Sequence, residues 1–297
     1  MGVGATGGHL LLMAKRRGAD FQSTLMIGRQ QHYMNKPFVQ YLFESHGQVI
    51  LDSDVDFILG NEYSENLLHF MGASSVDSLD ASDYEQATII HDMNFPIGNN
   101  VKQKYTLVLD FGTLEHIFNA PIALKNSIDL LKIGGFYICC VPCNNFMGHG
   151  FYQFSPEFFY NFLSKNGFGE IEIFLSLYSD PMVFFRTTDP RIFGGRIELV
   201  NDETVMINVI AKKAAHLSEI VFPIQSDYHD EIWQGRHPLR TAYTSSAPPV
   251  DPKLWEAMKI MKQLTATLSK WPVTVARSMA TGFENGLQYQ LIDPTKD

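Results

Sequence analysis

The sequence lacks several features that would mark a secreted or membrane-bound protein. It has only three cysteines, Cys139, Cys140 and Cys143, and this odd, clustered set predicts free thiols in a reducing compartment. No apolar run reaches the ~18 residues that a membrane span needs. The first residues do not follow the signal-peptide order of positive charge, apolar stretch and small-residue cleavage site. We therefore expect a cytoplasmic protein that does not enter a membrane.

Positive charge is also scarce. The chain has 23 Lys and Arg against 32 Asp and Glu, so its formal net charge is -9. The densest basic run, residues 15–17, has only three members, and we expect it to be a solvated helix face. Nucleic acid is an unsuitable substrate because tracking phosphates needs clustered positive charge.

A metal site is not predicted. Cys140 and Cys143 form a C-x-x-C pair, but a structural zinc site usually adds a second pair or nearby histidines. Cys139 and Cys140 are adjacent on a predicted strand and point to opposite faces, so they are poor disulfide partners. Buried thiols are the simpler interpretation.

One stretch organises the chain. With 297 residues, 45% of them hydrophobic, the protein can bury one large core. Residues 105–109 read as a strand, residues 114–131 as a helix interrupted near Asn119, and residues 136–141 as a second strand. Gly134 and Gly135 are expected to end the helix. Such a βαβ unit is right-handed with parallel strands, and ligands bind where its strands end.

The N-terminus contains a literal G-x-G-x-x-G, residues 2–7. A dinucleotide-binding loop needs a strand before it and a helix after it. We expect no strand there, so these glycines are interpreted as a flexible leader into a helix over residues 9–17. A nicotinamide-dependent oxidoreductase is rejected on this ground.

Two acidic residues lie at the ends of successive predicted strands. Asp80 ends residues 75–80, and Asp92 ends residues 87–92. At the carboxyl edge of a parallel sheet, Asp80 could accept hydrogen bonds from ribose hydroxyls and Asp92 from a purine amine. Both could instead cap turns, as Asp often does. The pair, followed by the βαβ unit, favours a nucleoside site.

These residues carry a resemblance to a known family. The Gly28 loop, residues 79–82 (LDAS), the HDMNFPI segment, the LEH of residues 114–116 and the LKIGG of residues 131–135 resemble class I S-adenosylmethionine-dependent methyltransferases of the small-molecule branch. The resemblance implies an α/β fold with a Rossmann-like seven-stranded sheet and helices on both faces. It also implies S-adenosyl-L-methionine as cofactor, bound by a set of residues at the strand ends: Gly28, Gln30, Asp80, Ala81, Asp92, Met93, Asp110, Phe111 and Gly112.

The first loop departs from the family pattern. Met26 stands where an acid is usual, and Gln30 and His32 replace glycines that let the backbone approach the cofactor. Gln30 or His32 could bind the methionyl carboxylate instead. The same departures support an alternative, in which the protein is a noncatalytic methyltransferase-like module that binds partners in a biosynthetic complex.

The segment after residue 141 is rich in amides, aromatics and glycines. Asn144, Asn145, His149 and Tyr152 are the expected substrate-binding residues. Methyl transfer needs an aligned nucleophile and a group that removes its proton, and the pKa of histidine suits that role. His149 is the first candidate base, Tyr152 could orient or share the role, and His116 is the second candidate. Ser155 and Pro156 then begin a helix.

The predicted organisation has three parts. Residues 1–22 form a leader helix, residues 23–213 the methyltransferase-like domain, and residues 214–297 a C-terminal extension. In the domain, residues 171–177 and 203–211 are expected to be antiparallel strands at the sheet edge. A helix over residues 253–270 carries an apolar stripe and could mediate a homodimer. The expected activity is methyl transfer to an oxygen, less readily a nitrogen, of a small polar molecule such as a sugar or a nucleotide-linked sugar.

Overall fold

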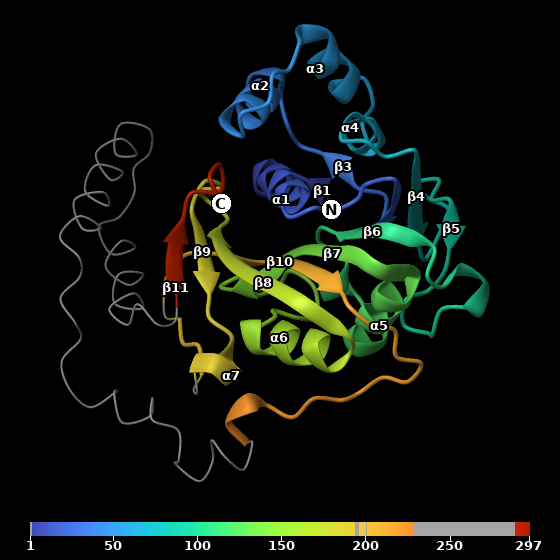
Figure 1. The fold of residues 1–297 in the computed structure, drawn as a ribbon, viewed down its shortest axis with the longest axis vertical. Coiled ribbons are helices and arrows are strands. Elements are labelled where there is room, and N and C mark those ends of the chain that lie inside the picture. Colours follow the sequence, from blue (N-terminus) through green and yellow to red (C-terminus); the bar gives the residue numbers. More distant parts are fainter. Residues whose placement is uncertain (1, 194–195, 200, 229–288) are drawn as a thin grey trace, which may run out of the picture.

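The computed structural model describes residues 2–193, 196–199, 201–228 and 289–297. The predicted helix over residues 253–270 and its dimer contact lie outside these residues. The described chain has a Rossmann-like α/β fold: one central sheet lies between two layers of helices (Figure 1). None of the described helices is long and apolar enough to cross a membrane.

The central sheet contains the seven expected strands and two more. Its order within the described residues is β11-β9-β8-β10-β7-β6-β2-β4-β5. The strands are β2 (Ser23–Ile27), β4 (Ser75–Asp80), β5 (Ile89–Ile90), β6 (Tyr105–Asp110), β7 (Leu131–Asn144), β8 (Phe168–Leu177), β9 (Phe184–Thr187), β10 (Val205–Lys213) and β11 (Tyr289–Ile292). Strands β5, β4, β2, β6 and β7 pair in parallel, whereas β10 pairs antiparallel with both β7 and β8.

Helices cover both faces of this sheet. On one face lie α1 (Ala5–Arg16), α2 (Lys36–Ser45), α3 (Asp52–Leu59) and α4 (Glu65–Phe70) (Figure 1). On the other lie α5 (Ala120–Leu130) and α6 (Pro156–Lys165), with the short α7 (Pro190–Phe193) near the edge. Successive strand residues alternate between the two cores: Leu107 and Leu109 face the first, and Tyr105 and Val108 the second. Burial on both faces explains why these strands read as continuous apolar runs.

Several predicted boundaries are confirmed. Helix α2 begins after Asn35, whose side chain accepts from the backbone N–H of Phe38. Ser155 caps α6 in the same way, with Pro156 at its first position. The interruption near Asn119 is also present, because a 3-10 turn over Leu114–His116 precedes α5. All three cysteines are free.

The expected helix stop at Gly134 and Gly135 is wrong. Helix α5 ends at Leu130, and β7 begins at the next residue. The buried Nζ of Lys213 donates to the carbonyls of Ile128 and Leu131 at 2.8 and 2.7 Å, so a distant lysine caps this helix end. Gly134, with φ +85°, instead lies at an irregularity where β7 shifts register against β6.

Two further expectations are corrected. Gly2–Val3 forms a short strand, β1, which pairs in parallel with β3 (Gln31–His32), and α1 begins at Ala5. The glycine-rich segment is therefore an ordered strand, turn and helix, but its two-stranded sheet is separate from the central one. The stretch between α2 and α4 contains a helix, α3. Strands β8 and β10 are not at the sheet edge, because β9 and β11 extend beyond them.

Lys15 and Arg16 are exposed, as expected for a solvated helix face, whereas Arg17 is partly buried. Lys15 donates to the carbonyl of Met71, and Arg16 to the carbonyls of Pro294 and Thr295. Arg17 forms ion pairs with Glu172 of β8 and with Asp297. Arg186 of β9 pairs with the same two carboxylates, at 2.9 and 2.6 Å. The basic run thus connects α1 to the sheet edge and to the C-terminal segment that contains β11.

We predict that Arg17→Ala destabilises the fold. The change would leave Glu172 and Asp297 with one cation for two half-buried carboxylates, so we expect the free energy of unfolding to fall by about 1–3 kcal/mol. Lys212→Ala is the matched control, since it breaks the more exposed Lys212–Glu170 pair on the same sheet, a loss of about 0–1 kcal/mol. Urea denaturation of both variants measures the difference. Equal losses would contradict the structural role of Arg17.

A second prediction concerns a buried histidine pair. The ring Nδ1 of His9 lies 2.8 Å from Nε2 of His46, and burial lowers the pKa of each from 6.5 to about 4. A histidine whose folded pKa is lowered adds stability that is present above pH 6.5 and is lost as pH falls toward 4. For the fully buried His9 this amounts to about 3 kcal/mol.

We therefore expect the wild-type protein to lose stability between pH 6.5 and 4, and His9→Gln to lose less. Urea denaturation across this pH range makes the measurement. His91→Gln is the control. The His91 ring is hydrogen-bonded to the carbonyl of Phe95 and is not part of the His9–His46 pair, so this variant should keep the full pH dependence of the wild-type protein. An unchanged pH slope in His9→Gln would refute the assignment.

Candidate functional site

A cavity of about 480 Å³ opens at the carboxyl ends of β6 and β7. Its walls come from six parts of the chain: the N-terminus, the segment after β3, the corner after β6, β7 with the loop that follows it, the segment after β8, and the start of β10. The lining residues are Gly2, Gly4, Ala5, Thr6, Gly7, Tyr33, Phe111, Gly112, Glu115, His116, Cys140, Phe146, His149, Tyr178, Pro181 and Met206. The size is typical of sites for small molecules.

The corner after β6 places two of the predicted residues at this cavity. Asp110 ends β6 and accepts from the backbone N–H groups of Thr113 and Leu114, which fixes the turn. Phe111 is buried and packs against α1, whereas Gly112 lines the cavity with φ +97°. The hydroxyl of Thr113 donates to the carbonyl of Ile27, so the ends of β6 and β2 are tied together.

The start of α1 forms the opposite wall. Gly4 is the N-cap and offers no side-chain acceptor. The first helical bond runs from Gly8 to the carbonyl of Gly4, so the N–H groups of residues 5–7 lack intrahelical partners. These groups and the positive end of the helix dipole are suited to an anionic group at this wall.

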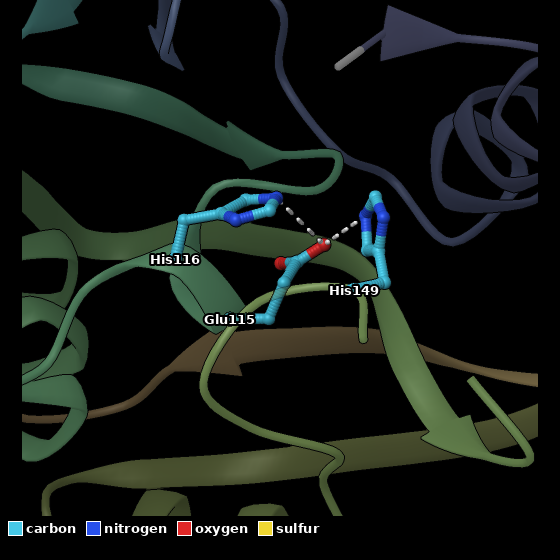
Figure 2. Close-up of side chains that lie close together, drawn as sticks. All are labelled: Glu115, His116 and His149. Carbon is cyan, nitrogen blue, oxygen red and sulfur yellow. Dashed lines mark ion pairs between the residues drawn. The ribbon is translucent and has the colours of Figure 1, made fainter. Parts of the chain in front are cut away.

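Three titratable side chains meet inside the cavity. Nε2 of His149 lies 3.5 Å, and Nε2 of His116 lies 3.9 Å, from Oε1 of Glu115. Figure 2 shows the two imidazoles on either side of the Glu115 carboxylate. The imidazole centroids of His116 and His149 are 4.9 Å apart. Both histidine side chains are 41% exposed, whereas Glu115 is 1% exposed, so the carboxylate is the buried member of the cluster.

The electrostatics of this cluster are unusual. Burial, followed by the nearby charge of Asp110, raises the pKa of Glu115 to about 8. Burial also raises the pKa of Asp110 to about 7, although its two backbone hydrogen bonds oppose the shift. Burial and His149 lower the pKa of His116. Neither carboxylate oxygen of Glu115 has a hydrogen-bond partner among the described residues.

The loop after β7 holds His149 in place. The Phe146 ring stacks on the imidazole, with centroids 4.3 Å apart and planes 11° apart. Phe151 donates its backbone N–H to the carbonyl of Glu115 at 2.7 Å. Gly150 has φ +79°, and a Cβ there would lie 2.7 Å from the same carbonyl oxygen. Only glycine therefore fits between the loop and Glu115.

The predicted substrate and catalytic residues are only partly brought together. His149 and His116 both line the cavity, as expected. Tyr152 does not, because its hydroxyl donates to the carbonyl of Phe118. The amides of Asn144 and Asn145 donate to Asn201, and that of Asn145 also to the carbonyl of Glu203. These three residues do not line the cavity, and their hydrogen bonds hold the loop in shape.

The predicted nucleoside residues lie outside this cavity, at the neighbouring strand ends. The backbone N–H of His91 donates to the carbonyl of Asp80 at 2.8 Å, so the ends of β4 and β5 do meet. Oδ1 of Asp80 accepts from Ser82, and Oδ1 of Asp92 accepts twice from Asn94. Both acids thus cap turns, which was the alternative interpretation. Oδ2 of each has no hydrogen-bond partner among the described residues.

Four other predicted cofactor residues also lie outside the cavity lining. Gln30 is fully buried, and its amide donates to the carbonyl of Ile27. The Met93 side chain is 4% exposed and packs in the core beside Asn126. Ala81 is exposed in the turn after β4, and Gly28, φ +72°, donates its N–H to the carbonyl of Leu79. The side chains of Gln30 and Met93 therefore face the protein interior.

The sequence pointed to His116 as a candidate but not to Glu115, which the structure places between His116 and His149. An acid directly before a candidate histidine is a signal that could have indicated it. Residues 2–7 were also missed, because their strand is only two residues long and pairs with β3, which is distant in sequence.

Comparisons with known proteins give structural similarity only. No family model matches the chain, and no curated protein does. Among solved structures, TehB from Haemophilus influenzae is 12% identical with a TM-score of 0.36, over 68% of this chain and 61% of TehB.

Two other solved structures that resemble this chain contain S-adenosylhomocysteine. NodS, an N-methyltransferase from Bradyrhizobium japonicum, is 12% identical with a TM-score of 0.35, over 68% of this chain and 83% of NodS. The 1,6-didemethyltoxoflavin-N1-methyltransferase from Burkholderia thailandensis is 9% identical with a TM-score of 0.36, over 70% of this chain and 78% of the enzyme. Scores of this size do not assign an activity, so the function must come from the chain's own residues.

We predict that Gly150→Ala disrupts the cavity wall. The substitution combines an unfavourable φ with a clash against the Glu115 carbonyl, so we expect a loss of about 2–4 kcal/mol in the free energy of unfolding. Gly148→Ala is the matched control: its φ is +98°, but a Cβ there meets nothing within 4 Å, so about 1–2 kcal/mol is expected. Urea denaturation compares the two. A loss in Gly150→Ala no greater than in Gly148→Ala would show that the close approach to Glu115 is not tight.

Proposed function

We propose that this protein transfers the methyl group of S-adenosylmethionine to an oxygen, less readily a nitrogen, of a small polar molecule. The observation that supports this proposal most directly is the cavity at the carboxyl ends of β6 and β7, with Glu115, His116 and His149 facing it. Ligands of open α/β sheets bind at this edge. The sequence resemblance to class I methyltransferases supplies the reaction class.

The residues present fit the cofactor in two respects. Asp80, at the end of β4, has one carboxylate oxygen without a hydrogen-bond partner in the described chain, as ribose recognition requires. The N-terminus of α1, with free N–H groups beside Gly112, suits the methionyl carboxylate. When bound, S-adenosylmethionine supplies an electrophilic methyl group on sulfur.

The side chains of the cavity would then align the acceptor. Phe146, Tyr33 and Tyr178 present aromatic surface, and the histidines present polar atoms. Aromatic faces beside convergent polar groups suit a sugar ring, which supports a sugar or a nucleotide-linked sugar as acceptor. His149, held by Phe146, is placed to receive the proton of an acceptor hydroxyl, and Glu115 lies behind it.

The competing function is a noncatalytic binding module. It is favoured by Gln30, whose buried side chain closes the turn where the family has glycines. It requires neither a cofactor nor the polar cluster in the cavity. A measurement of cofactor binding distinguishes the two functions, because the methyltransferase requires the cofactor and the binding module does not.

Calorimetry with S-adenosylhomocysteine provides the first test. We expect the wild-type protein to bind, and Asp80→Asn to bind about 10-fold or more weakly, because a hydrogen-bonded charged acceptor is lost. Asp83→Asn is the control: Asp83 is an exposed acid in the same turn, and its backbone carbonyl accepts a hydrogen bond from the N–H of Gln86. No binding by the wild-type protein at millimolar ligand would leave the binding module as the function.

Methyl transfer to a panel of sugars and nucleotide sugars provides the second arm. For an accepted substrate, His149→Gln should lower the rate by about 10²–10⁴-fold, the usual contribution of a group that handles the proton. His69→Gln, which alters a histidine on α4 outside the cavity, should leave the rate unchanged. Equal rates in the two variants would exclude His149 from the reaction.

A further inference from the structure

The carboxylate of Glu115 is buried in an electrostatically unfavourable environment. This carboxylate is 1% exposed, and neither oxygen has a hydrogen-bond partner in the part of the chain that the structure describes. A buried polar group without a partner costs free energy, and native proteins rarely retain one without a reason. An arginine or lysine would be the usual partner, but the side chains that face this carboxylate are the two histidines.

The three side chains have the geometry of a ligand set. One possible ligand atom from each of Glu115, His116 and His149 lies within 4.8 Å of the others. The histidine nitrogens lie 3.5 and 3.9 Å from Oε1 of Glu115, too far for strong hydrogen bonds. Two ligands bound tetrahedrally at about 2.1 Å from one ion are separated by about 3.4 Å, so both Glu115–histidine distances are already within about 0.5 Å of that value. The two histidine nitrogens lie within 4.8 Å of each other, so their half-exposed rings would close a remaining gap of up to about 1.4 Å.

The donor types select the class of ion. Two imidazoles and one carboxylate suit zinc and similar transition metals, whereas magnesium and calcium prefer oxygen ligands. A site with three protein ligands leaves a fourth position for water or a substrate atom. Here that position would face the cavity, because all three residues line it.

The surrounding chain already holds the ligands. Glu115 lies in the short helical turn after β6, where Asp110 fixes the backbone. Phe146 stacks on the His149 ring and sets its orientation, and Gly150 lets the loop lie directly against Glu115. Supported ligands of this kind lose little entropy on binding an ion.

We infer that Glu115, His116 and His149 form a binding site for one divalent transition-metal ion, with an open position that faces the cavity. This departs from the sequence analysis, which predicts no metal. The binding of the ion does not rest on the proposed function. A catalytic role for the ion does rest on the proposed function. An acceptor hydroxyl bound at the open position would have a lower pKa, and His149 would then act as a metal ligand instead of as a base.

Titration of the metal-free full-length protein with Zn²⁺ tests the site. Competition against a chromophoric chelator measures stoichiometry and affinity, without cofactor or acceptor. We expect one ion per chain in the wild-type protein. Glu115→Gln, His116→Gln and His149→Gln should each weaken binding by at least about 100-fold, because each removes one of three ligands. Mg²⁺ in excess should not compete.

A double variant, Cys140→Ser with Cys143→Ser, is the matched control. Cys140 also lines the cavity, and the C-x-x-C pair is the other group of zinc-binding side chains nearby. We expect this variant to bind Zn²⁺ as the wild-type protein does. Circular dichroism confirms the fold of each variant, and the two half-exposed histidines keep the test valid if Glu115→Gln does not fold.

Two results would overturn the inference. One is the absence of stoichiometric Zn²⁺ binding by the wild-type protein at micromolar concentration. The other is binding that survives in the histidine variants or is lost in the cysteine variant. Because the titration needs no S-adenosylmethionine, its failure would leave the proposed methyl transfer standing, and failure of cofactor binding would leave the metal site standing.

Discussion

The burial of the central strands on both faces is the constraint on which the rest of the structure depends. Residues along β6 and β7 alternate between two apolar cores, so their side chains are used for packing. Polar side chains that bind a ligand can therefore lie only where the strands end. Asp110, Gly112 and Glu115 follow β6, and Phe146 and His149 follow β7, so the loops at this edge form the site. The fold thus concentrates its functional residues in two short segments.

Burial also sets the properties of the polar groups that lie at this edge. The Asp110 carboxylate is fully buried but has two backbone N–H partners, and its role is structural. Glu115, five residues later, is buried without a partner. Lys213 shows how the protein treats a buried cation elsewhere, since its ammonium group donates to two helix carbonyls. Glu115 differs from Asp110 and Lys213 because it lacks such hydrogen bonds among the described residues. The two histidines beside its carboxylate make it suited to bind a metal ion together with them.

Local patterns predicted the architecture well. Ser155 and Pro156 mark the start of α6, and the apolar runs mark β6 and β8, because capping and burial act on neighbouring residues. Patterns failed where a distant partner decides the outcome. The end of α5 depends on Lys213, the order of residues 2–3 depends on β3, and β9 is completed by β11, about a hundred residues further along the chain.

The sequence by itself determined the α/β class and the parallel βαβ unit, and it indicated the histidine-bearing loop after β7 as a candidate site. These follow from residue spacing, which chain connectivity carries directly into structure. Only the tertiary structure decided that the N-terminal glycines form a wall of the cavity, that Tyr152 faces away, and that Glu115 lies between two histidines. Those relations join segments up to about 200 residues apart, and their cause is packing in three dimensions, which no local pattern encodes.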